Sequence, residues 1–214
     1  MTWLFLSFKR SAAALKDLRA LVTVSLLIAI AIAVGSLTVP VTQTIKISFV
    51  FLATSAVGMI GGPVYGLLSG AIIDVIGFMM KPTGGYNPAF TLITAFTGML
   101  YGLFLYGIDI PHVASADEGT ARGALQDIRA LYASRAGRLT LARILLAKLS
   151  VTVIGNLVLN TWALYYMYGK PEFWPWFAPR LVKNATMFPI EVVMLFLVLV
   201  PVKRLYDMTR RQHA

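Results

Sequence analysis

Three asparagines lie in or beside the two apolar runs that close the sequence. Asn156 and Asn160 are four residues apart, which would place them on one face of a regular α-helix. Asn184 follows near the start of the next run. An amide in an apolar helix needs a hydrogen-bonding partner, and it offers a flat polar heterocycle both a donor and an acceptor. The three asparagines are therefore candidate ligand-binding residues.

Cationic and aromatic residues accompany these asparagines on the side that the charge pattern places outside. Arg180 and Lys183 are three residues apart, and Lys46 precedes an earlier apolar run. Lysine and arginine suit the carboxylates of a ligand, whereas aromatic rings would stack on a heterocycle. An interfacial aromatic belt with snorkelling cations would also explain several of these residues. The further candidates are Tyr86, Asn87, Phe90 and Trp162.

No residue pattern indicates catalysis, a metal or a cofactor. The histidines, His112 and His213, have no metal-ligand partner at helical spacing, and the chain has no cysteine. There is no P-loop sequence for nucleotide phosphates, so we do not expect the chain to hydrolyse ATP by itself. The net charge of +10 comes without a basic and aromatic stripe, so nucleic-acid binding is not expected.

The composition predicts an all-α integral membrane protein. Charged residues make up 13% of the 214 residues and hydrophobic ones 58%, and the mean hydropathy is +0.75. We expect a single membrane domain, residues 1–214, that forms a compact bundle of six transmembrane helices. Gly61-Gly62-Pro63 is expected to break one long run into two helices joined by a tight turn. The spans are expected at about 20–39, 46–60, 63–80, 88–107, 141–168 and 181–204.

The distribution of basic residues predicts the orientation of the bundle. With both termini in the cytoplasm, the inner segments hold 14 of the 19 basic residues, Lys148 among them, in agreement with the positive-inside rule. One inner segment, about 109–138, carries apolar residues at helical spacing and is expected to be a cytoplasmic amphipathic segment. The first ten residues, MTWLFLSFKR, are interpreted as a short interfacial segment.

Small residues recur every fourth position in several spans. The series Gly62, Gly66 and Gly70 has a counterpart in Gly98 and Gly102, and small residues at this spacing let helices approach closely in lipid. We favour packing inside the bundle for the glycines. For the pair Ala29 and Ala33 in the first span, internal packing and docking of another protein are both open.

Two acids lie within apolar spans. Asp74 and Glu191 would be costly in lipid, so each is expected to face the bundle interior or a pocket. Either acid could serve a proton or ion site, or be a structural acid with a partner.

The loop KPTGGYNPAF, residues 81–90, is more elaborate than a simple hairpin requires. Pro82 and Pro88 shape it, and the adjacent Gly84 and Gly85 could act as hinges. We interpret the loop as a candidate gate over an outer binding site, because lids commonly open on such hinges.

Long segments of the chain resemble a known family. The run GGPVYGLLSGAIIDVIGFMMKPTGGYNPAFTLITAFTGMLYGLFLY, with RILLAKLSVTVIGNLVLNTWALYYMYGKP and RLVKNATMFPIEVVMLFLVL, is similar to the S components of energy-coupling factor (ECF) vitamin transporters. The folate-specific subfamily is the most similar. The resemblance implies a subunit of a prokaryotic plasma membrane that is not itself an enzyme. It would capture the vitamin outside and topple on a membrane-embedded T component driven by two cytoplasmic ATPase subunits.

The candidate residues also fit this resemblance, by motif for the docking pair and by chemistry and position for the ligand contacts. Many S components carry a small-xxx-small docking motif on the first helix, and Ala29 and Ala33 match it. For folate, the asparagines would read the pterin, the cations would bind the glutamate carboxylates, and Tyr86, Phe90 and Trp162 would supply stacking. The alternatives are an S component for another vitamin, such as pantothenate or riboflavin, an ion-coupled secondary transporter that uses Asp74, or a structural scaffold.

Overall fold

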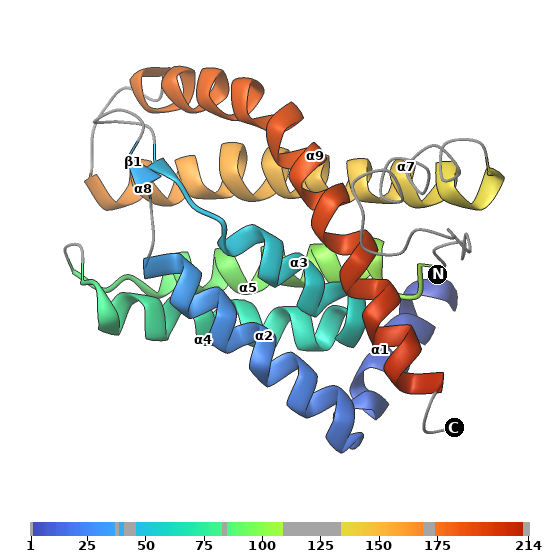
Figure 1. Cartoon of the computed structure of the whole chain (residues 1–214). Coiled ribbons are helices and arrows are strands. Elements are labelled where there is room, and N and C mark those ends of the chain that lie inside the picture. Colours follow the sequence, from blue (N-terminus) through green and yellow to red (C-terminus); the bar gives the residue numbers. More distant parts are fainter. Residues whose placement is uncertain are drawn as a thin grey trace.

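The protein is built almost entirely of helices (Figure 1). The computed structural model describes residues 2–36, 39–40, 46–82, 85–108, 134–168 and 174–211. Two short strands, β1 (Val39–Pro40) and β2 (Lys46–Ile47), pair in antiparallel fashion. The predicted all-α class is confirmed. The helices are α1 (Thr2–Ala14), α2 (Leu18–Ser36), α3 (Val50–Gly61), α4 (Pro63–Met80), α5 (Pro88–Leu105), α7 (Arg135–Ser150), the π-helix η1 (Val151–Leu159), α8 (Asn160–Tyr168) and α9 (Trp174–Arg211).

Five of the described helical stretches are long and apolar enough to cross a membrane. Helix α3 has 12 residues, which at 1.5 Å per residue is about 18 Å, less than the roughly 30 Å of the hydrocarbon core. The prediction of a span from residue 46 is wrong at its start, because Lys46 and Ile47 pair with β1. The five stretches are Leu18–Gly35, Pro63–Met80, Pro88–Leu105, Arg135–Tyr166 and Phe177–Thr209.

The glycine-rich break between α3 and α4 is the tight turn that the sequence predicts. Gly62 has φ of 85°, a left-handed conformation that favours glycine, and Pro63 starts α4. The N-terminal segment is a helix, α1, that packs on this turn. The Oγ of Ser11 donates to the Gly61 carbonyl at 2.6 Å and accepts from the Val64 amide at 3.0 Å. A single buried hydroxyl therefore joins α1 to both helices of the turn.

The predicted glycine packing joins α4 to α5 inside the bundle. A Cβ atom on Gly66 would lie 2.1 Å from the Gly98 carbonyl oxygen, and one on Gly70 would lie 2.3 Å from the Thr94 carbonyl oxygen. Backbone therefore meets backbone along this interface, which we call the α4–α5 seam. The internal-packing interpretation of the glycines is confirmed.

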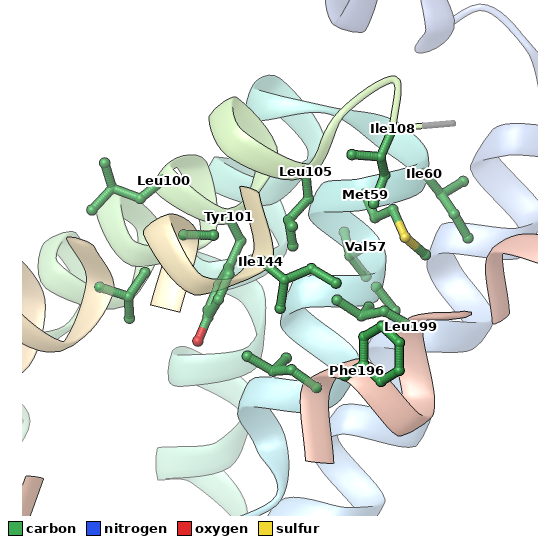
Figure 2. Packing of buried hydrophobic residues seen from close by; sticks show 14 of the residues in the cluster. Val57, Met59, Ile60, Leu100, Tyr101, Leu105, Ile108, Ile144, Phe196 and Leu199 are labelled. Atoms are coloured by element: carbon green, nitrogen blue, oxygen red, sulfur yellow. The ribbon is translucent and has the colours of Figure 1, made fainter. Parts of the chain in front are cut away.

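Buried apolar side chains from α2, α3, α4, α5, α7, η1 and α9 form the core, part of which Figure 2 shows. Helices α3 and α5 contribute most of the labelled residues, while α7 and α9 close the core from the other side. Figure 1 shows that α9 is bent as it crosses the bundle, and it contains Pro179, Pro189 and Pro201, which remove helix hydrogen bonds. The labelled core residues are Val57, Met59, Ile60, Leu100, Tyr101, Leu105, Ile108, Ile144, Phe196 and Leu199.

The two ends of the bundle are formed by different segments of the chain. In Figure 1 the two chain termini lie toward one end, and the strand pair, the α4–α5 connection and the end of α8 lie toward the other. Of the predicted ligand-binding residues, Lys46, Tyr86 and Asn87 belong to this second group of elements. Of the expected segment 109–138, residues 109–133 lie outside the described part of the chain, and 135–138 form the first turn of α7.

Candidate ligand-binding site

Two of the candidate asparagines, from different spans, meet in the structure. The Nδ2 of Asn156, in η1, donates to the Oδ1 of Asn184, in α9, across 3.4 Å. The Nδ2 of Asn184 in turn donates to the backbone carbonyl of Arg180 at 2.8 Å. All three residues are partly buried. The result is a short chain of two amides that ends on the backbone of Arg180. The amides could hydrogen-bond a polar heterocycle, and the Arg180 side chain could bind an anionic group.

The segment that carries Asn156 is a π-helix and not the α-helix that the sequence suggests. The amide of Asn160, the first residue of α8, donates to the Gly155 carbonyl five residues earlier, which is the π pattern. The α-helical geometry expected for Asn156 and Asn160 is therefore wrong for this segment, although residues four apart can also share a face of a π-helix. Gly155 also lets η1 approach α5 closely, because a Cβ there would lie 2.4 Å from the Thr97 methyl carbon.

The loop between α4 and α5 is tied to both helices by a chain of hydrogen bonds. Thr91 Oγ1 donates to the Asp74 carboxylate at 2.6 Å and lies 2.7 Å from the Tyr86 hydroxyl. Since the single hydroxyl proton of Thr91 goes to the carboxylate, Tyr86 is the donor in the second bond. We call Tyr86, Thr91 and Asp74 the loop latch. Asp74 is thus an acid with partners, as one of the two interpretations requires.

Other candidates in this loop have local structural roles. The Asn87 side chain accepts from the Ala89 amide at 2.9 Å and caps α5. The Tyr86 ring packs against Phe78 with centroids 5.3 Å apart. Phe90 is partly buried in the first turn of α5. Gly85 is exposed, whereas Gly84 lies outside the described residues.

The remaining candidates are Lys183, Lys46 and Trp162. Lys183 is partly buried one turn after Arg180, and the backbone of Lys46 pairs with Pro40 in the strands. Trp162 is 56% exposed, and its ring meets Tyr166 edge to face with centroids 4.8 Å apart. This placement of Trp162 agrees with the interfacial-belt alternative.

A buried ion pair that no sequence pattern predicted joins α7 to α9. Lys148 Nζ lies 2.8 Å from Glu191 Oε2, and the lysine side chain is 2% exposed. The ammonium group also lies 4.4 Å from the centre of the Phe51 ring. Lys148, which the charge count assigns to an inner segment, is therefore a buried residue of a membrane-capable stretch. A lysine inside one apolar run and an acid inside another was the signal that could have revealed the pair.

The two small residues of α2 face outward. Ala29 and Ala33 are exposed, while Val24 and Ala31 on the same helix are buried against the bundle. The exposed face also carries Leu26. Packing inside the bundle therefore does not account for the alanine pair.

Comparisons with known proteins agree with the helical arrangement. No protein-family model matches the chain. It is 33% identical over 156 residues to the folate transporter FolT of Clostridium novyi, covering 72% of this chain and 73% of that relative. It is 26% identical over 191 residues to the FolT of Streptococcus mutans, covering 89% and 90%. The chain is also similar to a crystal structure of FolT bound with folic acid, with a TM-score of 0.61 and 30% sequence identity. The match covers 84% of this chain and 91% of the FolT chain.

The membrane-capable helices and these similarities define a multi-pass protein of membrane transport. These relatives share the name folate transporter FolT, and the matches cover most of the length of each protein. The chain belongs to the family of folate-specific S components of ECF transporters, the FolT proteins. The resemblance found in the sequence is confirmed.

Proposed function

We propose that the chain binds folate at the outer end of the bundle and serves as the substrate-capturing subunit of an ECF transporter. The observation that carries this proposal is the chain of amides from Asn156 through Asn184 to Arg180, which joins two spans. It is supported by the similarity to a FolT structure bound with folic acid over 84% of the chain. Folate combines a pterin rich in donors and acceptors with a glutamate tail, and the amides and cations suit these two parts.

The candidate residues divide by chemistry. Asn156, Asn160 and Asn184 are proposed to hydrogen-bond the pterin, because amides can match both donors and acceptors. Arg180, Lys183 and Lys46 are proposed to bind the glutamate carboxylates. The walls and the entrance are assigned to Tyr86, Asn87, Phe90 and Trp162.

The delivery of folate is proposed to follow the ECF scheme. Six membrane-crossing segments, the shorter α3 included, would form one domain in a prokaryotic plasma membrane with both termini in the cytoplasm. The exposed pair Ala29 and Ala33 on α2 is the proposed docking face for the T component, and two ATPase partners would drive toppling. The loop with Gly84 and Gly85 is the proposed gate.

Folate binding by the purified protein in lipid nanodiscs tests the site. We expect Asn156→Ala and Asn184→Ala to weaken folate binding in isothermal titration by about tenfold or more, since a lost hydrogen bond to a buried group costs about 1–3 kcal/mol. Thr186→Ala is a matched control, because Thr186 is exposed on the same helix. Wild-type affinity in both asparagine variants would disprove the site, and a wild-type protein without folate binding would disprove the function.

A further inference from the structure

The buried ion pair of Lys148 and Glu191 has no part in the proposed binding site, yet it lies in the middle of the bundle. It joins α7 to α9, with a 2.8 Å contact and a lysine that is 2% exposed. Phe51 of α3 adds a third helix, because its ring lies 4.4 Å from the ammonium group. The cluster therefore connects three helices at one point.

The contribution of such a buried ion pair to the stability of the fold does not by itself explain its presence. Desolvating two charges commonly offsets their attraction, and replacing a buried pair by apolar residues is often neutral or stabilising. Ionisable residues inside membrane spans usually mark a functional region. The position of the pair relative to the ligand-binding amides indicates what that function is.

The same two helical stretches meet again at the amides. Lys148 and Asn156 lie on the α7–η1 stretch, while Glu191 and Asn184 lie on α9. The chain runs from the ion pair to the amide contact in one stretch and from the amide contact to the ion pair in the other. The stretches are thus antiparallel, and the two contacts fix their relative position along the bundle.

The spacing of the two contacts depends on the π-helix. Glu191 and Asn184 are seven residues apart, which is about two turns of α-helix, so they share a face. Lys148 and Asn156 are eight residues apart and would be about 80° apart around a regular α-helix. The π-helix η1 begins at Val151, between them, and its wider turns take up the additional residue. Both side chains can therefore face α9.

We infer that the Lys148–Glu191 pair is a positioning contact that sets η1 against α9 in the register that brings Asn156 and Asn184 together for the ligand. This inference rests on the proposed folate site. It makes Lys148 and Glu191 positioning residues for folate, although neither needs to touch it.

A double-mutant cycle between the ion pair and the amide tests this role. Lys148→Met combined with Glu191→Leu removes both charges, so no unpaired charge is left buried. We expect thermal unfolding close to that of the wild type and folate affinity lower by about tenfold, within the usual range of coupling energies. Asn156→Ala should then cost much less affinity in this background than in the wild type. A purely structural role would instead leave the cost of Asn156→Ala unchanged.

The chain offers a matched control. Lys203 and Asp207 also form an ion pair, but within α9 itself, and Lys203→Met with Asp207→Leu should leave folate affinity unchanged. If the Lys148 double variant does not purify as a folded monomer, Glu191→Gln, which keeps the side-chain volume, takes its place in the cycle with the same expectation of coupling. Wild-type affinity in the variant, or an undiminished effect of Asn156→Ala, would overturn the inference. If wild-type protein binds no folate, the proposed function fails instead.

Discussion

The loop latch predicts that one hydroxyl group controls both the α4–α5 packing and the rate of ligand exchange. Thr91→Val removes that hydroxyl while keeping the shape of the side chain. The change leaves the Asp74 carboxylate without the donor that lies 2.6 Å away in the wild type. It also leaves Tyr86 without the acceptor at 2.7 Å.

The size of the effect follows from the two bonds. A hydrogen bond to a charged group contributes about 1.5–3 kcal/mol, and one between neutral groups about 0.5–1.5 kcal/mol. Tyr86 is 47% exposed, so water replaces most of its bond, and the lower end applies there. We therefore expect Thr91→Val to lower the free energy of unfolding by about 2–3 kcal/mol, mainly through Asp74.

The substitution Tyr86→Phe tests the role of the loop independently of the packing of α4 on α5. It removes only the bond that holds the loop and leaves the contact between Thr91 and Asp74 in place. We expect unchanged thermal unfolding and folate dissociation faster by about two- to tenfold, as a loss of 0.5–1.5 kcal/mol from the closed loop would give. Stopped-flow fluorescence measures the dissociation rate, and differential scanning calorimetry measures unfolding.

Two results would refute this reasoning. If Thr91→Val left unfolding unchanged, the bond to Asp74 would not support the packing of α4 on α5. If Tyr86→Phe released folate at the wild-type rate, the loop would be a connector and not a gate, whatever the effect of Thr91→Val.

Three further predictions concern the helix contacts. Gly66→Ala should destabilise the protein by about 1–3 kcal/mol in thermal unfolding, because its Cβ would collide with the α4–α5 seam, whereas Gly77→Ala, with nothing within 4 Å, should stabilise it by about 0.5–1 kcal/mol. Equal effects of the two would contradict the seam. Ser11→Ala should cost about 1–3 kcal/mol and expose α1 to limited proteolysis, since two buried backbone groups lose their partner; unchanged cleavage would argue against this contact. Ala29→Trp should prevent co-purification with the T component while folate binding stays as in the wild type, and a complex that still forms would place the docking face elsewhere.

Much of the bundle could be predicted because lipid imposes simple rules on sequence. Apolar length located five stretches able to cross a membrane, and Gly61-Gly62-Pro63 located the turn between α3 and α4. The start of α3 could not be found in this way, because Lys46 and Ile47 directly precede an apolar run but pair with the neighbouring strand β1. Hydropathy contains no information about such pairing.

The site was predictable in its residues more than in its geometry. Amides in apolar runs pointed to Asn156 and Asn184, which do meet. No residue pattern predicts a π-helix, so the orientation of these amides could be determined only from the structure. Lys148 was misplaced because counting charges treats each cation separately, whereas its burial depends on an acid in another span. Thr91 was overlooked since a threonine in an apolar run is usually unremarkable.

The α4–α5 seam has a mechanical consequence. Where carbonyl oxygens of one helix lie against the glycines of the other, no layer of side chains remains that could change rotamer and let the helices slide. We therefore expect helices α4 and α5 to move as one rigid body during any transport cycle. Shape changes that admit or release a ligand then fall to the segments that can flex, above all α9 with its three internal prolines. Spectroscopic probes placed on α4 and α5 would keep a constant separation, and they would give a fixed frame in which the motion of α9 can be measured.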